Sequence, residues 1–205
     1  MQGFDPWSIG GVWEGVATNL RDNAPFAAVH RDGLTKEKRS QWDQAYRLGI
    51  ELADRGKPDE ARDAFLGVVG IDDRHAELHF RLACVLLASR QLDEAYDHFA
   101  QARDLDALRF RADSRINEII RDVAGRETCS GIYLVDAERA FRATDAAEHG
   151  IPGRELFYEH VHMTTGPIEG RPTAGREYST PVIVVRARQT VPSTIEKEAG
   201  DTRQP

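Results

Sequence analysis

The sequence predicts a mainly helical protein organised around two helical hairpins that share one pattern. Residues 42–73 align with residues 76–107, so that apolar side chains and turns fall on equivalent positions. Within each segment the apolar residues recur at i, i+3 and i+4, the spacing of one face of an α-helix. An interval of about 34 residues is typical of proteins that stack paired helices. These three observations predict the shape of the middle of the chain and leave its chemistry open.

The first 34 residues are predicted to be a partial α/β segment of strand and loop. Residues 1–18 are rich in Gly and Trp, and Val12–Thr18 is the stretch with strand character. A polar loop over 19–26 follows. Asp32-Gly33 is a turn signal, and a helix is expected to begin near Thr35.

Each repeat is expected to contain two helices joined by a short turn. In the first repeat the helices cover about Trp42–Arg55 and Asp59–Gly70, with Asp59 as the cap of the second. In the second repeat they cover Ala76–Ser89 and Asp93–Ala102. The helical region as a whole is expected to span residues 35–124.

A fifth helix is expected from about Leu108 to Ala124, with one apolar and one charged face. A helix of this kind covers the open end of a repeat stack. Its apolar face comprises Ala112, Ile116, Ile119, Ile120 and Val123. The arginines in and before it are interpreted as a solvated face that pairs with neighbouring acids, at positions Arg109, Arg111, Arg115 and Arg121.

Residues 125–163 are predicted to form a second, small α/β segment. Gly131–Asp136 has the pattern of a buried strand that ends in a carboxylate, and Ala137–Ala147 has that of a short helix. An aromatic and histidine-rich run follows at Leu156–Met163. Residues 164–205 are rich in Gly, Pro, Thr and charge, and we expect most of this tail to be disordered, with strand character only in Pro181–Ala187.

Composition and charge limit the classes of function. The chain has 205 residues, is 40% hydrophobic and carries a formal net charge of −7, which argues against a nucleic-acid binder because such proteins need a basic face. No apolar run approaches the roughly 18–20 residues of a membrane span, and the N-terminus lacks the features of a signal peptide. With Cys84 and Cys129 expected as reduced thiols, we expect a cytoplasmic protein that neither enters a membrane nor binds nucleic acid.

The two repeats resemble the tetratricopeptide repeat (TPR). The resemblance depends on small residues at matching positions and on an alanine and a phenylalanine in each second helix: Gly49 and Ala83, Ala61 and Ala95, Phe65 and Phe99. It implies a protein-interaction module. In the register of that family the groove-facing positions are Tyr46, Ile50, Phe80, Cys84 and Leu87.

This predicted groove is apolar and lacks the Lys and Asn with which such modules grip an acidic peptide end. About three repeats are needed for independent stability, and this chain has two with a cap. We therefore expect the groove to be covered by the chain's own flanking segments or by a protein partner.

Glu159-His160-Val161-His162 is the only dense cluster of residue types used in catalysis. A base histidine needs a carboxylate that fixes its tautomer and stabilises the imidazolium, and Glu159 lies one helical turn before His162. One alternative is a polar helix start with exposed histidines. Another is a metal site that adds His149, although no HExxH or Cys-x-x-Cys motif supports it.

Other polar residues have simpler interpretations. His79 occupies a packing position, so a core or surface histidine is expected there and at His75 and His98. Asp136 at the end of a strand is interpreted as a cap. Gly10-Gly11 lacks a phosphate-loop pattern, and the sequence indicates no cofactor.

The run from Gly150 to His162 resembles the last catalytic block of SGNH/GDSL-like hydrolases. In that family the block holds an acid and, three residues later, the catalytic histidine, so the resemblance implies that Glu159 is the acid and His162 the base. Residues 17–26 and 102–113 resemble other parts of the same group, as does Asn117, and the resemblance covers about residues 12–163.

The family's nucleophile and oxyanion parts are missing from this sequence. Its Gly-Asp-Ser and Gly-x-Asn blocks do not occur, and neither does a Gly-x-Ser-x-Gly elbow. Because the parts of a triad act as a unit, the sequence favours an inactive interaction module that resembles the C-terminal part of such a hydrolase. The alternative is an ester hydrolase in which Glu159 and His162 form the acid–base half and a missing segment or a partner supplies the serine.

Overall fold

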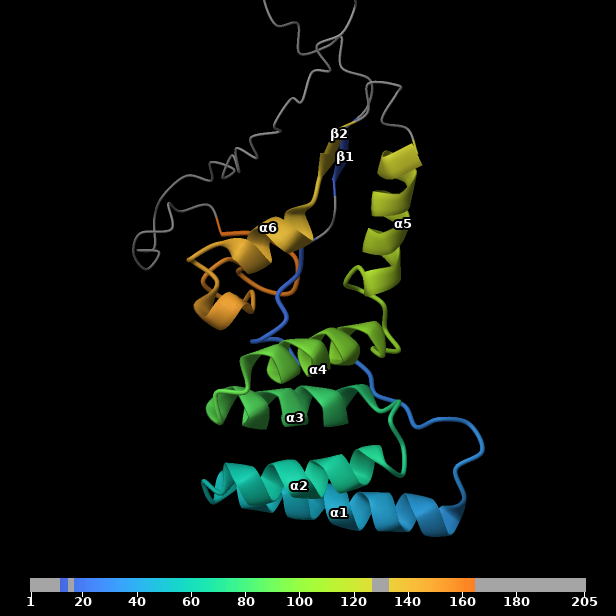
Figure 1. Ribbon diagram of the computed structural model, residues 1–205. Helices are drawn as coiled ribbons and strands as arrows, with labels where there is room; N and C mark the ends of the chain where they lie inside the picture. The colour runs from blue at the N-terminus through green and yellow to red at the C-terminus, as the bar shows by residue number, and fades with distance from the viewer. Residues whose placement is uncertain (1–11, 15–16, 127–132, 165–205) are drawn as a thin grey trace, which may run out of the picture.

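The computed structural model describes residues 12–14, 17–126 and 133–164. Within these ranges the protein is mainly helical: the first four helices lie stacked, and the two later α-helices and two short strands form a smaller part at one end of the stack (Figure 1). The predicted disordered tail lies outside the described residues from 165 onwards, as do Cys129 and most of the first 16 residues.

α1 (Lys36–Asp54) joins the helix start predicted near Thr35 with the first repeat helix predicted from Trp42. The hydroxyl of Thr35 caps it by accepting the backbone N–H of Lys38 at 3.3 Å. No Gly or Pro interrupts the chain between Thr35 and Trp42, so the helix is continuous.

α2 (Pro58–Val69) does not have Asp59 as its cap, and that prediction is wrong. The capping position is Lys57, whose side chain makes no capping hydrogen bond. Pro58 takes the first helical position, where a missing N–H costs nothing, and Asp59 lies in the first turn near the positive end of the helix dipole.

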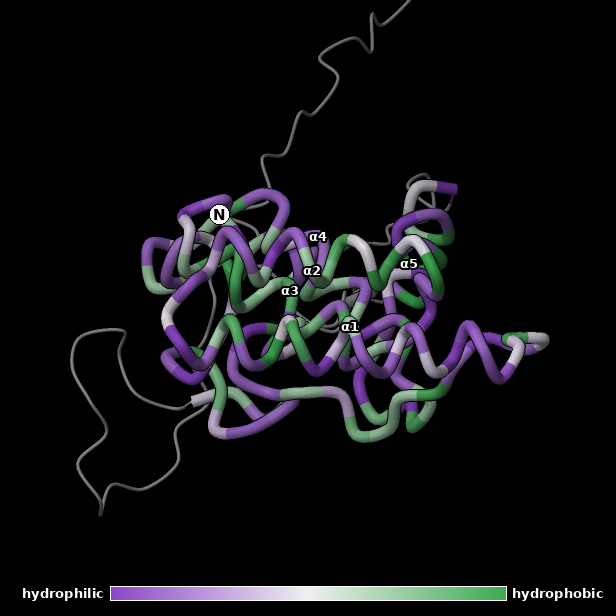
Figure 2. Tube along the Cα trace, turned by 90° about the horizontal axis from the view of Figure 1, so that it is seen from below, coloured by the Kyte–Doolittle hydropathy of each residue, from purple (hydrophilic) through white to green (hydrophobic). Residues whose placement is uncertain are grey.

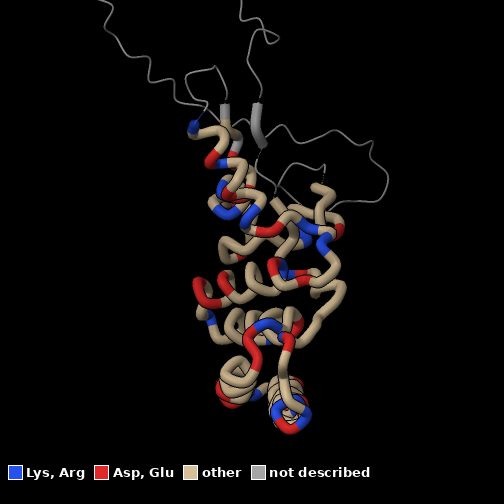
Figure 3. The backbone as a smooth tube through the Cα atoms, turned by 90° about the vertical axis from the view of Figure 1, so that its right-hand side faces the viewer, with Lys and Arg blue, Asp and Glu red and all other residues tan. Residues whose placement is uncertain are grey.

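α3 (Ala76–Ala88) and α4 (Leu92–Asp104) form the second hairpin. α3 agrees with the predicted range, whereas α4 begins and ends slightly outside it. Hydrophobic and hydrophilic residues are mixed along the stacked helices (Figure 2), and acidic and basic residues are interspersed along them (Figure 3). The core between the helices contains Ala61, Phe65, Val68, Leu78, Leu82, Leu86, Ala95 and Phe99.

The backbone of α1 at Gly49 packs closely against the ring of Phe65 on α2. At Gly49 an added Cβ would lie 2.6 Å from Cε1 of the Phe65 ring, so the ring occupies the space that any larger residue would need. The equivalent residue of the second hairpin is Ala83, which is fully buried. The small residues of the repeat pattern therefore have a steric cause.

α5 (Ser114–Arg126) begins at Ser114 rather than at Leu108 and does not close the stack as predicted. It stands beside the strands β1 (Val12–Glu14) and β2 (Tyr133–Val135), away from the layers of stacked helices (Figure 1). Its buried residues are Asn117 and Ala124, whereas Ile116 and Ile119 of the predicted apolar face are exposed.

The loop between α4 and α5 is held by the carboxylate of Asp106, which is 3% exposed. This carboxylate accepts the backbone N–H groups of Phe26 at 2.8 Å, Ala27 at 3.0 Å and Leu108 at 3.1 Å. The N–H of Ala107 also donates to the carbonyl of Ala27 at 2.9 Å. These contacts with a distant segment replace the helical hydrogen bonds that the local sequence would otherwise make.

Arg111 contradicts the prediction that these arginines form one solvated face, because it is 5% exposed. Its guanidinium donates to the carbonyls of Asn19 and Asn23, both at 3.1 Å, and lies 3.7 Å from Asp106. Burial lowers the pKa of Arg111 from its usual value, and the nearby Asp106 opposes that shift. Arg111 thus fastens the segment before α1 to the loop after α4.

β1 (Val12–Glu14) and β2 (Tyr133–Val135) pair as parallel strands, with Val12 opposite Tyr133. Both lie within stretches that the sequence predicts as strands. The helical stack and α5 lie between them in the chain, so the segments before and after the stack meet in one two-stranded sheet.

α6 (Ala137–Ala143) ends earlier than predicted and is followed by a 3₁₀ turn, Glu148–Gly150. The carboxylate of Asp136 accepts the backbone N–H of Arg139 at 3.1 Å, which confirms its interpretation as a cap. It also pairs with Arg121 of α5 at 2.8 Å. Burial opposes the shift, but these hydrogen bonds hold the pKa of Asp136 below its usual value.

Both flanking segments pack on the helical stack. Leu20 and Ile151 are buried in the same hydrophobic cluster as the side chains of α1 to α4. Arg103 of α4 is 3% exposed and donates to Glu138 of α6 at 3.0 Å. None of the helices in the described ranges has the length and apolar character needed to cross a membrane.

Candidate functional site

Glu159 and His162 face each other across a tight bend. Phe157 and Met163 form an isolated antiparallel bridge, and the N–H of Tyr158 donates to the carbonyl of His162 at 2.8 Å. Inside this bend Nδ1 of His162 contacts Oε1 of Glu159, and the backbone N–H of His162 donates to the same oxygen at 3.0 Å. The pair is brought together as predicted from its spacing, but by a bend rather than by a helix.

The electrostatics of this pair favour an ionised carboxylate on Glu159. Slight burial raises the pKa of Glu159, but hydrogen bonds from the His162 side chain and from the backbone N–H groups of His162 and His160 outweigh it and lower the pKa to about 2. A carboxylate on Nδ1 favours the tautomer that leaves Nε2 free to accept a proton. The His162 side chain is 79% exposed, so its imidazole is accessible.

Among the residues that the structure describes, His162 has no hydroxyl partner. Within residues 12–14, 17–126 and 133–164, no serine or threonine hydroxyl forms a hydrogen bond with His162; that of Thr164 donates to the carbonyl of Glu155 at 3.2 Å, and that of Ser114 accepts from Arg103 at 2.6 Å. The described residues therefore bring a carboxylate and an imidazole together without a hydroxyl nucleophile hydrogen-bonded to the imidazole.

His160 takes part in an aromatic cluster. Its ring stacks on Phe26, with centroids 4.2 Å apart, and meets the ring of Phe110 edge-on at 6.0 Å. His149 lies 3.8 Å from Glu148 and has an unusual φ of 60°. In the part of the chain that the structure describes, no three His, Cys, Asp or Glu side chains come together in a way that could hold a metal ion.

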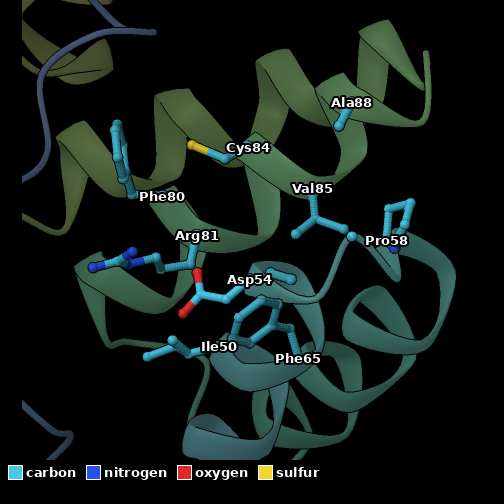
Figure 4. A pocket seen from close by; sticks show the side chains of 11 residues that line it. Ile50, Asp54, Pro58, Phe65, Phe80, Arg81, Cys84, Val85 and Ala88 are labelled. Atoms are coloured by element: carbon cyan, nitrogen blue, oxygen red, sulfur yellow. The ribbon is translucent and has the colours of Figure 1, made fainter.

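A pocket of about 430 Å³ lies between the two hairpins (Figure 4). α1, the following turn, α2 and α3 contribute its walls, which are mainly apolar. It is lined by Ile50, Ala53, Asp54, Gly56, Pro58, Phe65, Phe80, Arg81, Cys84, Val85 and Ala88.

Three of the five predicted groove residues line this pocket, namely Ile50, Phe80 and Cys84. Tyr46 and Leu87 do not. The Tyr46 ring stacks on Trp42, with centroids 4.6 Å apart, and burial raises the pKa of its hydroxyl to about 12. The helical period of α3 places Ala88 one turn beyond Cys84, so the sequence pattern contained the signal for this further wall residue.

Cys84 is exposed on the wall of the pocket, but its apolar surroundings raise the pKa of its thiol to about 11. At neutral pH the group is therefore a protonated thiol with little nucleophilic character. Its contribution to the pocket is apolar surface.

Comparison of the chain with protein-family models, with curated proteins and with solved structures gave no match.

Proposed function

We propose that this chain is a protein-interaction module of the TPR kind, in which the pocket between the hairpins binds an apolar side chain of a partner polypeptide. The observation that carries the proposal is the apolar pocket itself, which has the size of a side-chain or small-ligand site. Paired helices with small residues at Gly49 and Ala83 support the repeat assignment.

The chemistry of the pocket defines what it accepts. Phe65, Phe80 and Val85 offer aromatic and aliphatic surface, and the charged residues among its lining are Asp54 and Arg81. Arg81 is paired with Glu77 at 3.2 Å. A buried apolar anchor surrounded by a polar rim is the usual arrangement of an interaction hot spot.

Photo-crosslinking tests this function. A photoreactive residue in place of Ala88 is expected to form a discrete adduct with one polypeptide in extracts of cells that express the protein. The same residue in place of Leu66, which is exposed on α2 and does not line the pocket, is the control. Cys84→Trp, which fills the pocket, is expected to abolish the adduct. Equal labelling at both positions contradicts the proposal.

A second candidate function is ester hydrolysis of the SGNH kind, which the contact between Glu159 and His162 favours. In this proposal His162 is the general base, Glu159 orients it, and a segment outside the described residues or a partner supplies the serine. The strands β1 and β2 with α5 and α6 would then represent the α/β part of such a domain.

Hydrolysis of p-nitrophenyl acetate tests the second candidate. Activity that falls at least tenfold in His162→Ala and remains in His149→Ala would support it, because only the first variant removes the base. Activity that survives His162→Ala rules the proposal out, and absence of activity from the wild-type protein rules out a serine supplied by this chain itself.

A further inference from the structure

An exposed apolar surface lies between the segment before α1 and the loop after α4. Phe26 is 47% exposed, Leu108 58% and Phe110 53%, and Val29, three residues after Phe26 in the chain, is also exposed. The rings of Phe26 and Phe110 are 5.5 Å apart in an edge-to-face arrangement. We call these four residues the aromatic surface.

Hydrogen bonds to Asp106 and ring stacking hold the residues of the aromatic surface in place. Asp106 binds the backbone N–H groups of both Phe26 and Leu108, which fixes the two segments relative to each other. The His160 ring stacks on the Phe26 ring at 4.2 Å, and the Phe110 ring contacts both of them edge-on. Large apolar side chains fixed in this way lose little conformational freedom on binding, as is typical of docking sites.

The largest exposed apolar patch of a soluble monomer typically covers roughly 300–600 Å² and is often functional. A phenylalanine offers roughly 150–250 Å² of surface, so four large side chains about half exposed present on the order of 400 Å². A stable interface between globular proteins buries roughly 800 Å² on each partner. The aromatic surface therefore has the size of a site for a short peptide segment rather than for a second copy of the chain.

A polar pocket of about 330 Å³ continues from Val29 of this surface. Arg31 and Arg74 line it, and their guanidinium groups form no ion pair with any residue that the structure describes. A third arginine of the lining, Arg109, is paired with Asp113. The pocket thus offers two available cationic groups.

The acidic residues of the same pocket are mostly occupied by internal donors. Asp104 accepts from Arg103 at 2.8 Å and from the N–H of Ser114 at 3.0 Å. Asp106 is saturated by three backbone N–H groups. Asp32 is the one carboxylate of the lining without a hydrogen bond or ion pair among the described residues. Charge complementarity therefore favours an anionic group on the ligand.

We propose that this surface binds a short acidic and apolar polypeptide segment. Its apolar side chains pack on Phe26, Leu108 and Phe110, and the carboxylate of an aspartate or glutamate enters the pocket beside Arg31 and Arg74. This site is separate from the apolar pocket between the hairpins, so the two proposals can fail independently.

Selection from a displayed library of short random peptides, with the full chain as bait, tests the proposal. Enriched peptides are expected to combine large apolar residues with Asp or Glu. Their affinity is expected to fall about tenfold in Phe110→Ser and in Arg74→Glu, and to fall as salt is added. Leu66→Ser and Arg47→Glu are matched surface controls and should leave it unchanged.

Three results would overturn the proposal. They are failure of any peptide to enrich, enrichment of peptides rich in Lys and Arg, and undiminished binding to Phe110→Ser or Arg74→Glu. Thermal unfolding of each variant shows whether it is folded. If Phe110→Ser does not fold, Phe110→Leu is a milder second variant.

Discussion

Nδ1 of His79 lies 2.9 Å from Nδ1 of His98, and Nε2 of His79 lies 2.7 Å from the carbonyl oxygen of Asp73. The two imidazoles stack between α3 and α4, with ring centroids 5.1 Å apart. Because His79 is 2% exposed, this contact joins the two helices inside the core. It confirms the interpretation of position 79 as a packing position.

The histidine pair predicts that the fold loses stability in mild acid. Burial, followed by the proximity of His79, lowers the pKa of His98 to about 4. The unfolded chain, with a histidine pKa near 6.5, therefore binds more protons than the folded one as pH falls from about 6.5 toward 4, so stability decreases over that window. In His98→Gln the pH dependence of the free energy of unfolding is expected to flatten by on the order of 1 kcal/mol.

Urea unfolding at several pH values measures this effect. The prediction concerns how steeply the free energy of unfolding changes with pH, and not its absolute value. His149, which lies outside this pair, provides the control substitution, His149→Gln. Identical slopes for the wild type and His98→Gln would contradict the prediction.

Gly49→Ala is expected to destabilise the first hairpin by about 1–3 kcal/mol, because its Cβ would lie 2.6 Å from the Phe65 ring. Gly67→Ala on α2 is the matched control, since nothing lies within 4 Å of its added Cβ. That change is expected to stabilise the helix by roughly 0.5–1 kcal/mol. Denaturant unfolding of both variants measures the two effects, and equal shifts would argue against the close approach.

Asp106→Ala is expected to cost about 2–4 kcal/mol, because it leaves three partly buried backbone N–H groups and the buried Arg111 guanidinium without their carboxylate. Asp63→Ala removes an exposed carboxylate that pairs with Arg62 and should change stability by less than about 1 kcal/mol. Hydrogen exchange at the amides of Phe26 and Ala27 should accelerate only in Asp106→Ala.

The carboxyl of Glu159 is expected to titrate with a midpoint near pH 2 in NMR spectra. The folded-state pKa is depressed, so its stabilising contribution is complete above the unfolded pKa of about 4.3 and disappears as pH falls through about 2. His162→Ala should raise the midpoint, and His149→Ala should not. A midpoint near 4.3 in the wild type would contradict the hydrogen bonding around Glu159.

The repeat helices could be predicted because their determinants are local. Apolar periodicity and the Gly56 and Pro58 turn place α1 to α4 to within a few residues. The start of α5 could not be predicted in this way, since residues 105–113 have helix-compatible side chains. Asp106 and Arg111 hold that loop through partners about 80–90 residues earlier in the chain.

The candidate site shows the same division between local and distant contacts. The contact of Glu159 with His162 follows from their spacing, whereas the stacking of His160 on Phe26 joins distant segments and left no signal in the sequence. The groove prediction identified Ile50, Phe80 and Cys84 from repeat register but included Tyr46, which packs against Trp42 instead.

The pairing of Val12–Glu14 with Tyr133–Val135 has an evolutionary consequence. The hairpins belong to one long chain segment that begins after β1 and ends before β2, and these two strands are paired with each other. The entropic cost of bringing the ends of such a segment together rises only with the logarithm of its length. Gaining or losing one hairpin would therefore change this free-energy cost by roughly a few tenths of a kcal/mol. Lineages could therefore vary the number of hairpins while keeping these two strands in register.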